Sequence, residues 1–150
     1  MSFNNEYIKF WQEFGESRTM VLSTSLNDRV TSRNMSMIIL DEKFYFQTDK
    51  TFQKYEQLNS NPLVALCVDN IQIEGKCKEI GTPSDHIVFL EMFKKYFASS
   101  FKSYSYLDHE RLFVIEPISI QRWIYKEDVP YIEKFNIVKG EYSLKRYLPE

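Results

Sequence analysis

The residues best suited to chemistry in this sequence form one ordered set that would bind an anion. Arg33 lies in the middle of a β-rich run, and Thr48 ends the next such run. A predicted helix that carries Gln53 and Lys54 follows directly. A guanidinium offers a planar fork of donors, an ammonium a point charge, a hydroxyl a further donor, and a helix N-terminus its free amide groups. Together these groups suit a phosphomonoester dianion.

Spacing alone does not establish such a site. Most lysine and arginine side chains are solvated, and a basic residue on a strand followed by one on a helix is common. On spacing alone, the ordinary interpretation of Arg33 and Lys54 is therefore a pair of surface cations. An anion site requires that the fold bring the segments together, as an antiparallel meander would.

Other kinds of site find little support in the residue types present. His86 and His109 are the only histidines, and neither has the spacing of a zinc ligand, so no metal site is predicted. Cys67 falls in an apolar run and Cys77 on the apolar face of a predicted strand, so both are expected to be core residues. The four scattered glycines form no nucleophile elbow, phosphate loop or dinucleotide loop. The residue types therefore leave two kinds of site, one in which carboxylates act in acid–base catalysis and one that binds an organic cofactor.

Size and composition predict one globular domain over residues 1–150. The formal net charge of −2 argues against a nucleic-acid partner. The longest apolar run, Leu63–Val68, is too short to cross a bilayer, and no signal peptide is evident at the start of the sequence. With two cysteines there is no disulfide framework, so a reduced, cytoplasmic protein is expected.

The hydrophobic pattern alternates between short strands and helices. Aromatic residues at helical spacing predict a helix over residues 4–14, and a threonine at position 51 is predicted to cap a short helix within residues 49–59. Thr82 with Pro83 predicts a further helix start, whereas residues 99–106 are expected to form a loop. The predicted strands are residues 19–25, 29–40, 43–48, 63–68, 71–78 and 112–125.

Short connections between most of these strands imply antiparallel pairing, with a meander over the first three. The continuous apolar run at 63–68 is expected to be buried on both faces, and the tail from residue 126 to 150 is not assigned. Six short antiparallel strands with helices between them predict a mainly β, α+β fold, a small closed barrel with flanking helices.

The segment from Val21 to Ile80 resembles the pyridoxamine 5′-phosphate oxidase-like flavoproteins, which are FMN-binding split β-barrels. The shared pattern is an arginine in a central strand, an aromatic strand ending in threonine, a lysine six residues later, and an asparagine–proline pair leading into an apolar strand. Here its elements are Arg33, Phe44–Thr48, Lys54, Leu58, Asn61–Pro62 and Leu63–Val68. The wider resemblance covers roughly residues 15–125.

The resemblance implies a six-stranded antiparallel split β-barrel that binds FMN as a homodimer. By analogy, Arg33 and Lys54 hold the phosphate of FMN. The family pattern assigns further cofactor contacts. Beside the phosphate these are Thr48 and Gln53, and along the ring Asn34, Met35 and Gln47. Asn70, in place of a glutamine, and Trp123 complete the set. In the family this tryptophan reaches the flavin of the other subunit, and an ordinary core aromatic is the alternative for Trp123.

The sequence also departs from the oxidases at the residues that bind their substrate. A lysine five residues after the strand arginine is replaced by Ile38, and Ser100 stands where an arginine is expected. After the final tryptophan, Val129 and Tyr131 replace an arginine and a histidine. The residues that bind the cofactor in the oxidases are therefore largely retained, whereas those that bind pyridoxamine phosphate are not. Oxidation of vitamin B6 is thus not predicted.

Two functions of different classes follow. The first is an FMN-dependent oxidoreductase acting on an unidentified small molecule, with NAD(P)H as a possible electron donor. The alternative is a protein that binds or senses flavin, haem or a deazaflavin without turnover. Haem is the weaker option, because only His86 and His109 are available as axial ligands.

Overall fold

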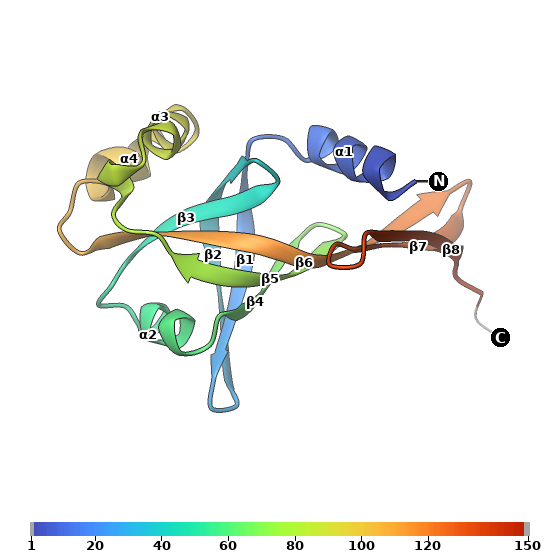
Figure 1. Ribbon diagram of the computed structural model, residues 1–150, viewed down its shortest axis with the longest axis horizontal. Helices are drawn as coiled ribbons and strands as arrows, with labels where there is room; N and C mark the ends of the chain where they lie inside the picture. The colour runs from blue at the N-terminus through green and yellow to red at the C-terminus, as the bar shows by residue number, and fades with distance from the viewer. Residues whose placement is uncertain (1, 149–150) are drawn as a thin grey trace.

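The computed structural model describes residues 2–148, in which eight antiparallel strands form one sheet in the order β3-β2-β1-β4-β5-β6-β7-β8 (Figure 1). An additional pairing of β3 with β6 closes the first six strands into a barrel. The strands are β1 (Ser17–Leu26), β2 (Arg29–Leu40), β3 (Lys43–Asp49), β4 (Leu63–Val68), β5 (Ile71–Glu79), β6 (Glu110–Lys126), β7 (Val129–Asn136) and β8 (Glu141–Arg146). The mainly β fold with a six-stranded antiparallel split barrel is confirmed.

Four α-helices flank the barrel within the described residues. They are α1 (Phe3–Phe14), α2 (Gln53–Ser60), α3 (Ile87–Tyr96) and α4 (Ala98–Tyr104), with a 3₁₀ turn, η1 (Pro83–Asp85), before α3. In Figure 1, α2 and the α3–α4 pair flank the same end of the barrel, and α1 lies toward the other side, over β7 and β8. One end of the barrel is thus enclosed by helices from two separate parts of the chain.

Two-residue hairpin turns set the register of the first strands. Asn27 and Asp28 both have positive φ, and so do Asp41 and Glu42. This backbone matches the right-handed twist of paired strands, so Ser17 pairs with Ile38 and the β1–β2 ladder runs without a break to the turn. The predicted meander over these strands is confirmed.

The core fills the barrel and extends under α1. Phe44, Phe46 and Phe113 are fully buried inside the barrel, and the α1 side chains Tyr7 and Phe10 pack against Phe135 of β7. Aromatic rings of this size bury large apolar areas, so α1 is held to the sheet mainly by the hydrophobic effect.

A β-bulge interrupts the pairing of β5 with β6. Glu74 pairs with Ser119 and Gly75 with Pro117, so Ile118 is an extra residue on β6. The strands approach closely here, since a Cβ atom on Gly75 would lie 2.5 Å from Cγ2 of Ile115. Position 75 therefore requires glycine, because a side chain there would clash with β6.

Three features differ from the predictions. The unassigned tail forms β7 and β8, because β6 runs on past the barrel and offers a free edge for pairing. The predicted loop at 99–106 contains α4 instead. The helix α2 begins at Gln53 without a side-chain cap, since the Thr51 hydroxyl donates to the Asp49 carboxylate at 2.7 Å.

The burial predicted for β4 is wrong on one face. Val64 and Leu66 point into the core, whereas Leu63 is 57% exposed and Cys67 is also exposed. Cys77 on β5 is buried, as expected, and burial raises the pKa of its thiol to about 12. The barrel therefore presents an apolar outer face along β4. None of the helices within residues 2–148 is both long enough and apolar enough to span a bilayer.

Candidate functional site

A cavity of about 390 Å³ lies at the helix-enclosed end of the barrel. Strands β2 and β3 form one wall, the start of α2 forms a second, and Phe93, Ser100 and Tyr104 from α3 and α4 form the third. Five of the nine residues predicted to bind the cofactor line it, namely Asn34, Met35, Gln47, Thr48 and Lys54. The fold thus brings together segments that are separate in the sequence.

Lys54 is a partly buried cation in this cavity. Burial is the main factor that lowers its pKa, and the nearby charge of Arg33 lowers it further. Its Nζ atom lies 4.6 Å from the centre of the Phe52 ring, and no ion pair joins it to a carboxylate within residues 2–148. Lys54 therefore keeps its charge free for an anionic ligand.

Arg33 lies beside the cavity and is oriented by neutral oxygen atoms. Its guanidinium donates to Thr24 Oγ1 at 2.8 Å, to the Leu22 carbonyl at 3.3 Å, and to Thr31 Oγ1. Both threonine hydroxyls in turn donate to Gln57 Oε1 on α2, at 2.5 and 2.8 Å. Burial lowers the pKa of Arg33. Because these acceptors are uncharged, the positive charge of Arg33 is oriented but not neutralised.

Thr48 supplies the clearest sign that the cavity is built for a polar ligand. Its side chain is buried, and its Oγ1 atom has no hydrogen-bond partner within the described part of the chain. Buried hydroxyl groups are nearly always paired, because leaving one unpaired costs free energy. A ligand oxygen could provide the missing hydrogen-bond partner of this hydroxyl. The donor set of Thr48, Lys54 and Arg33 therefore fits the phosphate of a cofactor.

Besides Arg33, which lies beside the cavity, three of the nine predicted residues do not line it. The side-chain amide of Gln53 is exposed and faces the Arg29 guanidinium. Asn70 and Trp123 line a separate hollow of about 160 Å³, where the Asn70 amide donates to the Trp123 carbonyl. Trp123 is 38% exposed and packs against Tyr147, so it is not a core residue. A role for these three in cofactor binding stays a prediction.

Two carboxylates at the cavity were missed by the sequence reasoning. Asp49 ends β3 and Glu110 begins β6, and the two residues pair directly across the strands. Nothing local in the sequence signals this contact, because it depends on the closure of the barrel between strands far apart in the chain. The only available signal was an acidic residue immediately before an apolar strand.

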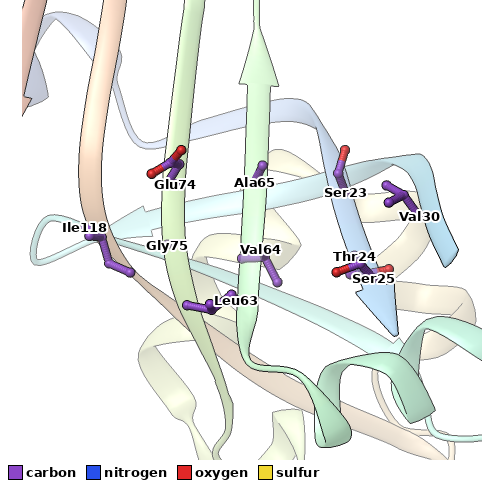
Figure 2. Close-up of a pocket in the computed structure, with 10 residues that line it drawn as sticks. All are labelled: Ser23, Thr24, Ser25, Val30, Leu63, Val64, Ala65, Glu74, Gly75 and Ile118. Atoms are coloured by element: carbon purple, nitrogen blue, oxygen red, sulfur yellow. The ribbon is translucent and has the colours of Figure 1, made fainter. Parts of the chain in front are cut away.

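A second hollow, of about 400 Å³, opens on the outer face of the barrel. Figure 2 shows its lining on β1, β2, β4, β5 and β6, with Leu63 and Ala65 of β4 near the middle. Glu74 is the charged residue in this lining, and no lysine or arginine among residues 2–148 contributes to it. This chemistry does not suit a phosphate group, so the helix-enclosed cavity is the better candidate site.

Comparison with known proteins agrees with this fold. The family model described as "Pyridoxamine 5'-phosphate oxidase" matches residues 7–124. The chain belongs to this family. The resemblance predicted from the sequence is thus confirmed. No curated protein matches the chain.

Solved structures of the same fold bind different ligands. A pyridoxamine 5′-phosphate oxidase-related, FMN-binding protein from Nostoc punctiforme is 15% identical with a TM-score of 0.59, the match covering 88% of this chain and 87% of that one. PhzG from Burkholderia lata, in complex with tetrahydrophenazine-1-carboxylic acid, has 15% identity and a TM-score of 0.66, with 99% and 94% covered. HutZ, the heme storage protein from Vibrio cholerae, has 17% identity and a TM-score of 0.60, with 78% and 91% covered.

Proposed function

We propose that the protein binds FMN in the helix-enclosed cavity and acts as a flavin-dependent oxidoreductase on a small molecule. One observation carries the proposal: Thr48, whose buried hydroxyl has no partner within residues 2–148, and Lys54, which no carboxylate of those residues pairs, line the same cavity. Membership of the family and the FMN-binding relative from Nostoc punctiforme support it. When bound, FMN would supply the hydride or electron transfer.

The residues of the chain would bind and orient the cofactor. Lys54 and Arg33 would hold the phosphate by charge, and the Thr48 hydroxyl would donate to it. Asn34 and Met35 on β2 would line the ring, with Gln47 opposite on β3, where the Gln47 side-chain oxygen already accepts a hydrogen bond from Ser105 at 2.8 Å. The rest of the cavity would then be left for a substrate.

The substrate of the name-giving oxidases does not suit this cavity. Ile38, which stands where they carry a lysine, is fully buried against Phe89, Phe93 and Leu112. Ser100 lines the helical wall where an arginine is expected. Neither residue offers a charge for a second phosphate, so the proposed substrate is a small molecule other than pyridoxamine phosphate.

We also propose that two copies associate through the outer face of β4. Leu63 and Val30 are 57% and 67% exposed at the hollow in Figure 2, and burial of such apolar surface favours association. In a homodimer, Trp123 and Asn70 would be available to the cavity of the partner copy. This arrangement would account for their distance from the cavity within one chain.

The absorption spectrum of the purified protein incubated with FMN, haem or neither tests the proposal. We expect retention of FMN, with the visible absorption of a flavin, and bleaching of that absorption by NADH or NADPH under anaerobic conditions. Retention without bleaching by any reductant would favour a binding protein. Haem absorption that is lost when His86 or His109 is replaced would contradict the FMN proposal. In the structure, His86 Nε2 already lies 2.7 Å from the Ile80 carbonyl, away from the cavity.

Replacing Thr48 by valine is expected to separate ligand binding from stability. Valine keeps the shape of threonine and removes a hydroxyl that has no partner, so the free energy of unfolding should stay the same or rise by up to about 1 kcal/mol. FMN affinity should fall by about 1.5–3 kcal/mol, the contribution of a hydrogen bond to a charged group such as the phosphate. Fluorescence titration and urea unfolding measure the two quantities. The exposed Thr19 on β1, changed to valine, is the matched control. Unchanged affinity in Thr48→Val would contradict the proposed contact.

A further inference from the structure

Glu110 is a buried acid at the edge of the cavity, with a role not yet assigned. Its side chain is 5% exposed and lines the cavity together with Lys54 and Asp49. Within residues 2–148, its carboxyl group makes no hydrogen bond and no ion pair, whereas its main-chain carbonyl accepts from Arg111 and its main-chain amide donates to the Leu107 carbonyl. A buried carboxyl group with no partner is costly when ionised.

The groups around Glu110 favour its neutral form. From β3, Asp49 lies directly opposite, and hydrogen bonds from the Thr51 amide (2.8 Å) and hydroxyl (2.7 Å) lower the Asp49 pKa and keep it ionised. From α2, Lys54 faces the same cavity and favours the ionised form of Glu110. Burial and the Asp49 charge outweigh Lys54 and raise the pKa of Glu110 to about 7.

The remaining charged and titratable groups near this acid do not neutralise it. Arg111, next to Glu110 on β6, directs its guanidinium to the Asp108 carbonyl and to Glu79. His109 is exposed, and its charge helps to lower the pKa of Asp49. The wall formed by α3 and α4 adds Tyr104 as its titratable group lining the cavity. Glu110 therefore responds chiefly to Asp49, to Lys54 and to any ligand between them.

We propose that Glu110 makes the preference of the cavity for a phosphate-bearing flavin over a phosphate-free one weaken as pH rises, because Glu110 must take up a proton when the phosphate binds beside Lys54. This inference rests on the proposed function. An ionised Glu110 competes with the phosphate for Lys54 and repels it, whereas a neutral Glu110 does neither. Since the bound phosphate adds a further negative charge, it stabilises the protonated acid, and phosphate affinity must fall as pH rises through about 7.

The test compares FMN with riboflavin, which lacks the phosphate, in wild-type protein and in Glu110→Gln. Dissociation constants are measured by flavin fluorescence at about pH 6 and about pH 8, on either side of the Glu110 pKa of about 7. The phosphate of FMN also gains charge over this interval, but it does so equally for every variant. The exposed Asp108, changed to asparagine, is the matched control because it lies two residues away and does not line the cavity.

We expect Glu110→Gln to bind FMN about tenfold more tightly than wild type at about pH 8 and equally at about pH 6, since a pKa change of one unit alters an equilibrium constant tenfold. Riboflavin should bind equally to both at either pH, and Asp108→Asn should follow wild type. Equal FMN binding by wild type and Glu110→Gln at both pH values overturns the inference. The inference is also overturned if riboflavin binding differs between wild type and Glu110→Gln in the same way as FMN binding.

A second measurement uses wild-type protein alone, in case the variant does not fold. Calorimetric titration with FMN in two buffers of different ionisation enthalpy counts the protons taken up. At about pH 8 the free phosphate is already a dianion, so uptake of a fraction of a proton would support the inference and release or no change would overturn it. Failure of wild-type protein to bind FMN at any pH overturns the proposed function, and this inference with it.

Discussion

Replacing Lys54 by alanine is expected to weaken FMN binding by about 1.5–3 kcal/mol, the contribution of a hydrogen bond to a charged group. That is a factor of roughly 10 to 150 in the dissociation constant. The reason is that Lys54 is partly buried in the cavity and forms no ion pair with a carboxylate in the described chain, so its charge is available to the ligand. Arg33→Ala should have an effect of the same size.

Flavin fluorescence titration with FMN and with riboflavin measures this effect. Riboflavin binding should change little in either variant, because it has no phosphate for these cations to hold. Lys139→Ala is the control, since Lys139 is an exposed cation in the turn between β7 and β8, far from the cavity along the chain. The site assignment fails if FMN affinity is unchanged in both Lys54→Ala and Arg33→Ala.

Removal of the Glu133 carboxylate is expected to cause the largest loss of stability. Glu133 is 4% exposed on β7 and accepts hydrogen bonds from Arg122 Nε at 2.8 Å and from the Tyr142 hydroxyl at 2.7 Å. Its Oε1 also lies 2.7 Å from Arg122 Nη2. Breaking a buried ion pair by removing one partner typically costs about 3–5 kcal/mol. Because Arg122 also reaches Glu13 at 3.6 Å, we expect Glu133→Ala to lose about 3 kcal/mol.

Urea unfolding followed by circular dichroism gives the free energy of unfolding for this comparison. Glu141→Ala on β8 is the control, since this acid is exposed and makes no ion pair within residues 2–148. A double-mutant cycle with Arg122→Ala should show a loss smaller than the sum of the single losses, because the two side chains share one interaction. A loss below about 1 kcal/mol for Glu133→Ala would mean that the pair contributes no more than an exposed one.

Local features of the fold could be predicted from the sequence because they depend on neighbouring residues. The hairpin turns at Asn27-Asp28 and Asp41-Glu42 are examples, since the turn type and the strand ends are set within a few residues. The tail was harder, because the buried polar residue Glu133 breaks the apolar alternation of β7, and its burial depends on Arg122 from another strand. Likewise, the all-apolar run of β4 gives no sign of which face is exposed.

The candidate site could be predicted only in part, because some of its contacts join segments that are distant in the sequence. Thr48 and Lys54 are six residues apart, so a strand followed by a short helix brings them to one cavity. The pairing of Asp49 with Glu110 joins the end of β3 to the start of β6, which are far apart in the sequence, and has no local pattern. The resemblance to the family identified the cations, but it carried no information about the acid that faces Lys54.

The extra residue Ile118 in β6 changes the phase of the strand. Before it, the interior positions are Phe113 and Ile115, and after it the interior position is Ile120. Side chains alternate between faces with a period of two, so if β6 paired regularly, without leaving Ile118 unpaired, Ile120 and Arg122 would turn outward and Trp123 inward. The bulge at Ile118 therefore decides which side chains of the sheet beyond the barrel face α1 and which face away.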